Sequence, residues 1–236
     1  MADKKTKSWP RRIFKWAANT FLVLFVGSIV AVVLYKFIPV PITPLMVIRT
    51  IEGAIDGRGV GIDKDWVSYD EISPHFFRAV ISAEDARFLR HGGIDWRAVD
   101  AAKKYNEAHK GKRVHGASTI TMQTAKNTFL WNGRNYIRKG FEVYFTYLIE
   151  AVWGKKRILE VYANIVELGD GVYGVEAASQ KYFGKPAKNL TKIQAARIAA
   201  VLPNPRRWSP AKPTRYIQRR VRFISGRQNS IALPKD

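Results

Sequence analysis

The sequence predicts a mostly α-helical protein, with one N-terminal transmembrane helix followed by a single helical domain. An uncharged stretch of 19 residues, 17–35, is about long enough to cross the hydrocarbon core of a bilayer. Helix-capping residues recur along the rest of the chain, and we find no internal repeat and no convincing strand of alternating polarity. The 236 residues leave room, after an anchor, for one domain with one core.

The apolar stretch favours an uncleaved anchor over a cleaved signal peptide. Its apolar core exceeds the roughly 7–15 residues of a signal peptide, it lacks an A-x-A-like cleavage site, and Trp16 and Tyr35 flank it as interfacial aromatics. Six cations precede it, and Lys36 alone follows within the next dozen residues. This positive-inside bias predicts a cytoplasmic N-terminus and a domain outside the cytoplasmic (inner) membrane. The predicted boundaries are a basic cytoplasmic segment 1–16, a transmembrane helix 17–38, a Pro-rich neck 39–44 and the domain 45–236.

Capping signals place the helices of this domain. Ser73-Pro74 predicts a helix that continues to Gly92-Gly93, and Asp95 can cap the next one. Residues 169–174, GDGVYG, are predicted as a loop. The other predicted helices begin near Thr43, Ser118, Tyr136 and Lys155, after residue 174, at Thr191 and at Thr214.

Composition limits the kinds of partner and of chemistry. The chain has 40 Lys and Arg against 19 Asp and Glu, a formal charge of +21, which implies an anionic partner such as nucleic acid, anionic lipid or a phosphorylated substrate. It has no cysteine, which excludes disulfides, a Cys-ligated zinc site and thiol catalysis.

Two polar clusters stand out as candidate chemistry. On a continuous helix, Glu84 would share one face with Phe88, His91 and Asp95, beside the second acid Asp85. Downstream, the polar segment 115–127 has Lys126 near its end. Arg134, Arg138 and Glu142 follow at intervals of four residues, which places them on one face of a helix. One carboxylate apart from cations and one beside them suit a reaction with a general base and a phosphate leaving group. A solvated charged face is the alternative reading of the first cluster.

The order of five segments resembles the peptidoglycan glycosyltransferase family. These segments are EDARFLRHGGID, HGASTITMQTAKN, RKGFE, RILEVYANIVELGDGVYGVEAASQKYFGK and ARIAAVLPNPRRWSP, and the likeness, closest to the monofunctional membrane-anchored members, covers nearly all of the chain after the anchor. The resemblance implies a lysozyme-like helical fold and a role in cell-wall biosynthesis. The substrate it implies is lipid II, a disaccharide-pentapeptide on a polyprenyl pyrophosphate.

The resemblance also implies roles for individual residues. Glu84 matches the catalytic base, and Glu142 matches a second catalytic carboxylate whose role is less defined. Lys126 and Arg134 match positions that hold the pyrophosphate, and Arg138 and Lys139 add charge beside them. The remaining substrate-binding candidates are Asp85, His91, Ser118, Thr119, Gln123 and Asn127. For His91 a packed, hydrogen-bonded brace is an equal alternative.

Two rival functions remain open on sequence alone. A lysozyme-like glycan-cleaving enzyme would use one acid on a similar scaffold, but it releases no pyrophosphate for the cations to hold. A membrane-tethered nucleic-acid-binding module would bind phosphates through the excess of Lys and Arg, but it would place nucleic acid outside the membrane. The expected partners are therefore lipid II, the growing glycan, membrane lipid and other cell-wall synthesis or division proteins, and not nucleic acid. No cofactor and no metal ligand is predicted, although the sequence leaves assistance by a divalent cation open.

Overall fold

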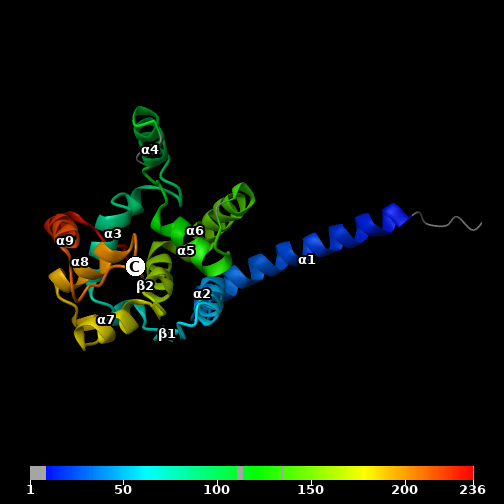
Figure 1. Ribbon diagram of the computed structural model, residues 1–236. Helices are drawn as coiled ribbons and strands as arrows, with labels where there is room; N and C mark the ends of the chain where they lie inside the picture. Colours follow the sequence, from blue (N-terminus) through cyan, green and yellow to red (C-terminus); the bar gives the residue numbers. More distant parts are fainter. Residues whose placement is uncertain (1–8, 111–113, 134, 236) are drawn as a thin grey trace, which may run out of the picture. The chain divides into compact units, whose positions relative to one another are not determined.

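The computed structural model describes residues 9–110, 114–133 and 135–235, and it divides the chain into two compact units, Met1–Ile38 and Pro39–Asp236. The first unit contains helix α1, Trp9–Phe37, shown in blue in Figure 1. Within it, Arg11–Phe37 is long and apolar enough to cross a membrane, by length and composition. An N-terminal apolar helix compatible with a membrane anchor is thus present. The finer division into cytoplasmic segment, anchor and neck remains a prediction.

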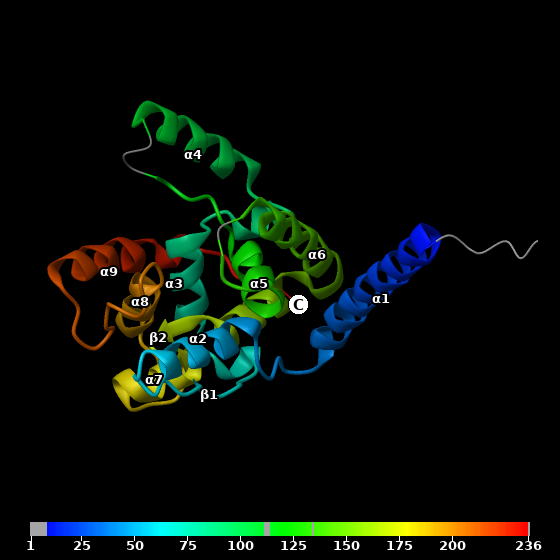
Figure 2. The ribbon, with the colours of Figure 1, turned by 45° about the vertical axis from the view of Figure 1, so that its right-hand side comes forward.

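The second unit is mostly helical, as predicted. Its α-helices are α2 Pro44–Ile55, α3 Pro74–Glu84, α4 Trp96–Ala108, α5 Ile120–Phe129, α6 Tyr136–Ile165, α7 Val175–Phe183, α8 Lys192–Val201 and α9 Arg215–Arg227. Four short 3-10 turns occupy Tyr69–Glu71, Phe88–Arg90, Ala187–Asn189 and Gln228–Ser230. Figures 1 and 2 show α3, α8 and α9 lying together on one side of this unit, whereas α4 projects away from it.

Most predicted helix starts are confirmed, because their signals are local. The side chains of Thr43, Ser73, Asp95 and Thr191 each accept a hydrogen bond from a backbone N–H in the first turn of α2, α3, α4 and α8. Gly154 has φ 72° and ψ 167°, which breaks α6 just before Lys155, where a new helix start was predicted.

Two predictions about local structure were wrong. The helix that begins at Pro74 ends at Glu84 rather than at Gly92-Gly93, so Glu84, Phe88, His91 and Asp95 do not share a helix face. The expectation of no strand and of a loop over residues 169–174 also fails. A small sheet of order β1-β3-β2 joins Asp63–Lys64, Val172–Tyr173 and Glu167–Gly169, with β1 parallel and β2 antiparallel to β3. Strands of two or three residues are too short to show alternation in a sequence.

The core of the second unit lies between α3 and the helices that pack on it. Phe76, Phe77 and Val80 of α3 are almost fully buried. Helix α8 contacts both α3 and α9. It buries a run of small side chains, Ala195, Ala196, Ala199 and Ala200, so neighbouring backbones can come close. This packing fixes the C-terminal end of α3, where Glu84 lies.

Candidate active site

Glu84 is a mostly buried carboxylate at the last residue of α3. Its side chain is 17% exposed. Oε2 accepts a hydrogen bond of 3.0 Å from Gln123 Nε2 on α5, and Oε1 lies 3.9 Å from Arg220 Nη2 on α9. Within the described part of the chain, Oε1 has no hydrogen-bond donor. This oxygen is therefore available to accept a proton from a substrate.

Burial is the main cause of a raised pKa at Glu84. The neighbouring charge of Asp85 acts in the same direction, whereas the Gln123 hydrogen bond and the positive charge of Arg220 oppose it. A carboxyl with a raised pKa is a stronger base once it is ionised. The site thus combines burial, which strengthens the base, with a cation that helps to keep it ionised.

Gln123 is held in place from its other side by Tyr162. The Tyr162 hydroxyl donates a hydrogen bond of 3.4 Å to Gln123 Oε1, which directs the amide Nε2 toward Glu84. Tyr162 is fully buried, and this burial, together with the charges of Glu84 and Asp85, raises its pKa well above the usual value. Its hydroxyl therefore stays protonated and acts as a donor.

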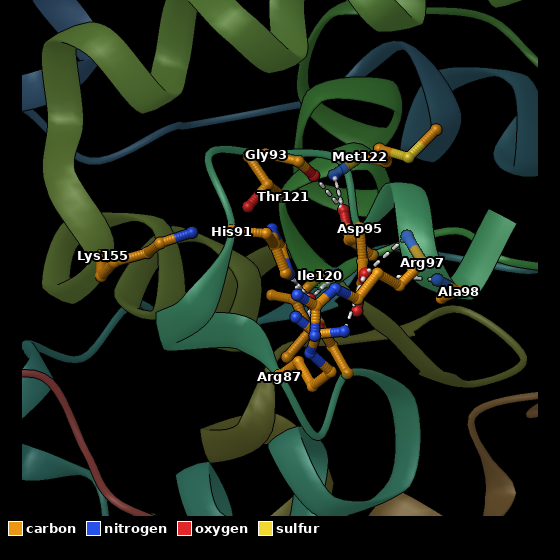
Figure 3. A network of polar contacts seen from close by, with 12 residues as sticks. Arg87, His91, Gly93, Asp95, Arg97, Ala98, Ile120, Thr121, Met122 and Lys155 are labelled. Atoms are coloured by element: carbon orange, nitrogen blue, oxygen red, sulfur yellow. Dashed lines mark hydrogen bonds and ion pairs between the residues drawn. The ribbon is translucent and has the colours of Figure 1, made fainter. Parts of the chain in front are cut away.

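Asp85 and His91 form a buried brace next to Glu84. The Asp85 carboxylate accepts hydrogen bonds from His91 Nε2 at 2.9 Å and from the Ile120 N–H at 3.1 Å, at the N-terminus of α5. In Figure 3 His91 lies beside Ile120. Asp85 has φ −158° and ψ 69°, so the chain leaves the helix at this residue and turns its carboxylate toward α5. This long-range bonding is the physical reason why α3 stops at Glu84.

The other polar candidates differ in exposure. Thr119 is buried and caps α5: its hydroxyl donates to the Gly93 carbonyl and accepts from the Met122 N–H. Asn127 is also buried, at the C-terminal end of α5, whereas Ser118 is exposed. Thr119 therefore positions α5, and of these three Ser118 is the one that a ligand can reach from solvent.

The second carboxylate, Glu142, is surrounded by cations on α6. Its oxygens accept hydrogen bonds of 2.6 Å from Arg138 and of 2.6 Å from Lys139. Glu142 is 3% exposed and Arg138 is 9% exposed, whereas the Lys139 side chain is 43% exposed. Glu142 therefore orients the two cations, and its own oxygens are already occupied.

Lys126 connects this cation cluster with α5. It lies three residues after Gln123, so the two side chains share a face of the helix. Burial lowers the pKa of Lys126, the charges of Arg138, Lys139 and Arg49 lower it further, and Glu142 opposes them. Helix α5 packs against α6, and these mutual effects indicate that the Lys126 side chain lies within electrostatic range of the α6 cluster. Arg134 lies outside the described residues.

Comparison with known proteins identifies the family. A sequence model of the family described as transglycosylase matches residues 54–229, which is most of the second unit. The chain belongs to the transglycosylase family.

Curated relatives of this transglycosylase are similar over nearly their full length. It is 55% identical over 221 residues to a biosynthetic peptidoglycan transglycosylase of Bdellovibrio bacteriovorus, which covers 94% of this chain and 87% of the relative. It is 53% identical over 204 residues to a protein of that name from Caulobacter vibrioides, covering 86% of each chain. A third, from Rhodospirillum centenum, is 54% identical over 216 residues, covering 92% of this chain and 90% of the relative. The predicted family and the mostly helical fold are confirmed.

Arg220 of the transglycosylase was not among the residues predicted for the site. A basic helix was predicted after Thr214, but nothing in the prediction distinguished Arg220 from the other arginines of that helix. The buried residues of α9 are Ile217, Val221 and Ile224. Arg220 follows Ile217 by three residues and precedes Ile224 by four, so it lies on the apolar face. An arginine on the buried face of an amphipathic helix is unusual, and this pattern could have identified Arg220 as a candidate site residue.

The transglycosylase shows no cluster suited to a metal ion within residues 9–110, 114–133 and 135–235, where no three His, Asp or Glu side chains come together in a suitable arrangement. Three basic side chains lie in this part of the structure. Lys126, Arg138 and Lys139 supply the positive charge that an anionic group would meet.

Proposed function

We propose that this transglycosylase polymerises lipid II into glycan strands in cell-wall biosynthesis, with inversion at MurNAc and release of polyprenyl pyrophosphate. Membership in the transglycosylase family and the shared name of the relatives, biosynthetic peptidoglycan transglycosylase, support a peptidoglycan glycosyltransferase. The chain is then an enzyme of the hexosyltransferase type.

One structural observation carries the mechanism: a single face of α5 joins the base to the cations. Gln123 on this face donates a hydrogen bond to Glu84. Lys126, three residues further along α5, lies within electrostatic range of Arg138, Lys139 and Glu142 on the adjoining helix α6. A proton acceptor and an anion site beside one face of the same helix suit a sugar whose anomeric carbon is attacked on one side and releases pyrophosphate on the other.

In the proposed reaction Glu84 is the general base. Its ionised carboxylate takes the proton from the 4-hydroxyl of the acceptor's GlcNAc as that oxygen attacks the anomeric carbon of the donor's MurNAc. The bond from that carbon to the pyrophosphate oxygen breaks, and the configuration changes from α to β. Polyprenyl pyrophosphate leaves with the bonding electron pair, so charge and atoms balance.

The cations stabilise the negative charge that develops on the leaving group. Arg138 and Lys139 pair with Glu142, Lys126 lies within electrostatic range of all three, and Arg134 belongs to the same proposed set. Fixed cations aimed at oxygens where charge accumulates lower the energy of the transition state more than that of the ground state. Glu142 keeps Arg138 and Lys139 in position. Among the remaining candidates, Asp85, His91 and Thr119 act through the fold, whereas Ser118, Gln123 and Asn127 shape the site.

The proposed location is the outer face of the cytoplasmic membrane, with α1 as a single-pass anchor and the N-terminus inside. The six cations before the apolar stretch support this orientation. Lipid II, the glycan and membrane lipid are the proposed partners, together with other cell-wall synthesis or division proteins. A reporter fused after Asp236 and active only in the cytoplasm should be inactive, and activity there would reverse the topology.

The deciding experiment incubates the detergent-solubilised full chain with labelled lipid II. Formation of polymer together with released polyprenyl pyrophosphate is the expected result. Shortening of preformed glycan, without polymer from lipid II, would instead support a cleaving enzyme and overturn the proposal.

A further inference from the structure

A charged pocket lies on the second unit, apart from the Glu84 carboxylate. It is bounded by α2, by the loop that follows α2, by the β2–β3 turn and by the loop after α8, and its volume is about 470 Å³. Its charged lining residues are Arg49, Arg58, Glu167, Asp170, Arg206 and Arg207. The proposed mechanism uses none of these side chains.

The pocket has more positive than negative charge. Asp170 pairs with Arg58 at 2.9 Å and with Arg206 Nε at 3.2 Å, so one carboxylate holds two arginines at the rim. Within the described residues, the two Nη groups of Arg206 and the whole guanidinium of Arg207 have no hydrogen-bond partner, and no carboxylate lies within 4.0 Å of Arg207. Guanidinium groups with free donors are suited to bind a carboxylate through paired hydrogen bonds.

The pocket is also lined by a partly buried ion pair, Arg49 with Glu167, that is incompletely satisfied, although Arg49 Nη1 donates a hydrogen bond of 2.7 Å to Glu52. Arg49 Nε lies 3.5 Å from Glu167 Oε2, which is long for a hydrogen bond, and the Glu167 side chain is 9% exposed. Glu167 Oε1 and the Tyr173 hydroxyl are buried and have no hydrogen-bond partner among the described residues. Burying such groups costs stability, which argues for a role other than folding.

Arg49 also links the pocket with the cation cluster of the active site. Helix α2, which carries Arg49, contacts α5, which carries Lys126. The positive charge of Arg49 helps to lower the pKa of Lys126. Arg49 thus lines the pocket from a helix that also contacts the helix of the proposed pyrophosphate site.

The chemistry of lipid II indicates what such a pocket would bind. The stem peptide is attached to MurNAc, the sugar that also carries the pyrophosphate. A five-residue peptide extends over at most about 18 Å, so its carboxylate end can lie well away from the pyrophosphate. We propose that this pocket binds the terminal carboxylate of a stem peptide through Arg206 and Arg207. The inference rests on the proposed function and adds a determinant of substrate specificity to it.

The test compares two substrates and two forms of the full-length enzyme. One lipid II carries a free C-terminal carboxylate on its pentapeptide, and the other carries a carboxamide there. For the wild type, amidation should raise KM about tenfold, equivalent to about 1.4 kcal/mol, with kcat little changed. In the R206Q/R207Q double variant, KM for the carboxylate substrate should rise by a similar factor, and amidation should have no further effect.

A matched control removes the same charge elsewhere. Arg215 and Arg222 are exposed on α9, so R215Q/R222Q should discriminate between the two substrates as the wild type does. Equal KM values for both substrates with the wild type, or discrimination retained by R206Q/R207Q, would overturn this inference while polymerisation itself stands. Failure of the wild type to polymerise either substrate would overturn the proposed function, and the inference with it.

Discussion

Replacing Glu84 by Gln tests the general base most directly. A glutamine at this position keeps the shape of the side chain, and its carbonyl oxygen can still accept the 3.0 Å hydrogen bond from Gln123. It cannot accept a proton from the acceptor hydroxyl. Proton transfer by a positioned side chain contributes about 10²–10⁴-fold, so initial rates of lipid II polymerisation should fall about 100-fold or more, about 2.7 kcal/mol of barrier.

Lipid II affinity and thermal stability separate this effect from misfolding. The cations of α5 and α6 are untouched in Glu84→Gln, so lipid II binding should be largely kept. Burial raises the pKa of Glu84, which means that the folded state holds this proton more tightly than the unfolded chain does. The associated stability is present at low pH and is lost as pH rises through the raised pKa. Removing the charge should therefore leave Tm at pH 8 equal to or above that of the wild type.

The pH dependence of kcat/KM can refute the assignment of Glu84 as the general base. In the wild type, kcat/KM should rise as pH passes through the pKa of Glu84, and this acidic limb should vanish in Glu84→Gln. If Glu84→Gln keeps more than about a tenth of the activity together with the wild-type acidic limb, Glu84 is not the base. Glu142 would then become the candidate.

Three further substitutions test the cation beside Glu84 and the proposed binding site for the pyrophosphate. Arg220→Gln removes the cation 3.9 Å from Glu84, so the acidic limb of kcat/KM should move to higher pH; an unchanged limb would contradict a role for this charge. Lys126→Arg replaces a lysine whose pKa is lowered by burial with a permanently charged group, so activity should persist to higher pH, and an earlier alkaline loss would count against the assignment. Glu142→Gln leaves Arg138 buried and only partly paired, so denaturant unfolding should show a loss of about 3 kcal/mol, with weaker lipid II binding. If Glu142→Gln keeps the wild-type stability and the wild-type affinity for lipid II, Glu142 does not orient Arg138 and Lys139.

The sequence predicted local features well because their causes are local. A Thr, Ser or Asp side chain that caps a helix bonds to a backbone two or three residues away, so the starts at Thr43, Ser73 and Asp95 could be read directly. The pairing of Arg138 and Lys139 with Glu142 depends only on helical spacing and was equally accessible.

Contacts between distant segments could not be read in this way. The premature end of α3 depends on Asp85 bonding to Ile120, 35 residues away, whereas the sequence offered the glycines at 92 and 93 as the obvious stop. The contact between Glu84 and Gln123 spans 39 residues, and that between Glu84 and Arg220 spans the fold from α3 to α9. The spacing of residues within one helix does not predict contacts with residues of another helix. The family resemblance supplied the roles of Glu84 and Lys126, which periodicity did not.

The anchoring of α5 by Asp85 has a consequence for inhibitor design. Asp85 follows Glu84 directly in the chain and binds the first N–H of α5, while Gln123 and Lys126 lie on one face of that same helix. The helix that carries Gln123 and Lys126 is therefore tied to the residue next to Glu84 by a buried hydrogen bond of 3.1 Å, and Gln123 bonds to Glu84 itself at 3.0 Å. A compound that joins a hydrogen-bond donor for Glu84 to an anionic group for Lys126 can accordingly use a stiff spacer, which loses less conformational entropy on binding than a flexible one.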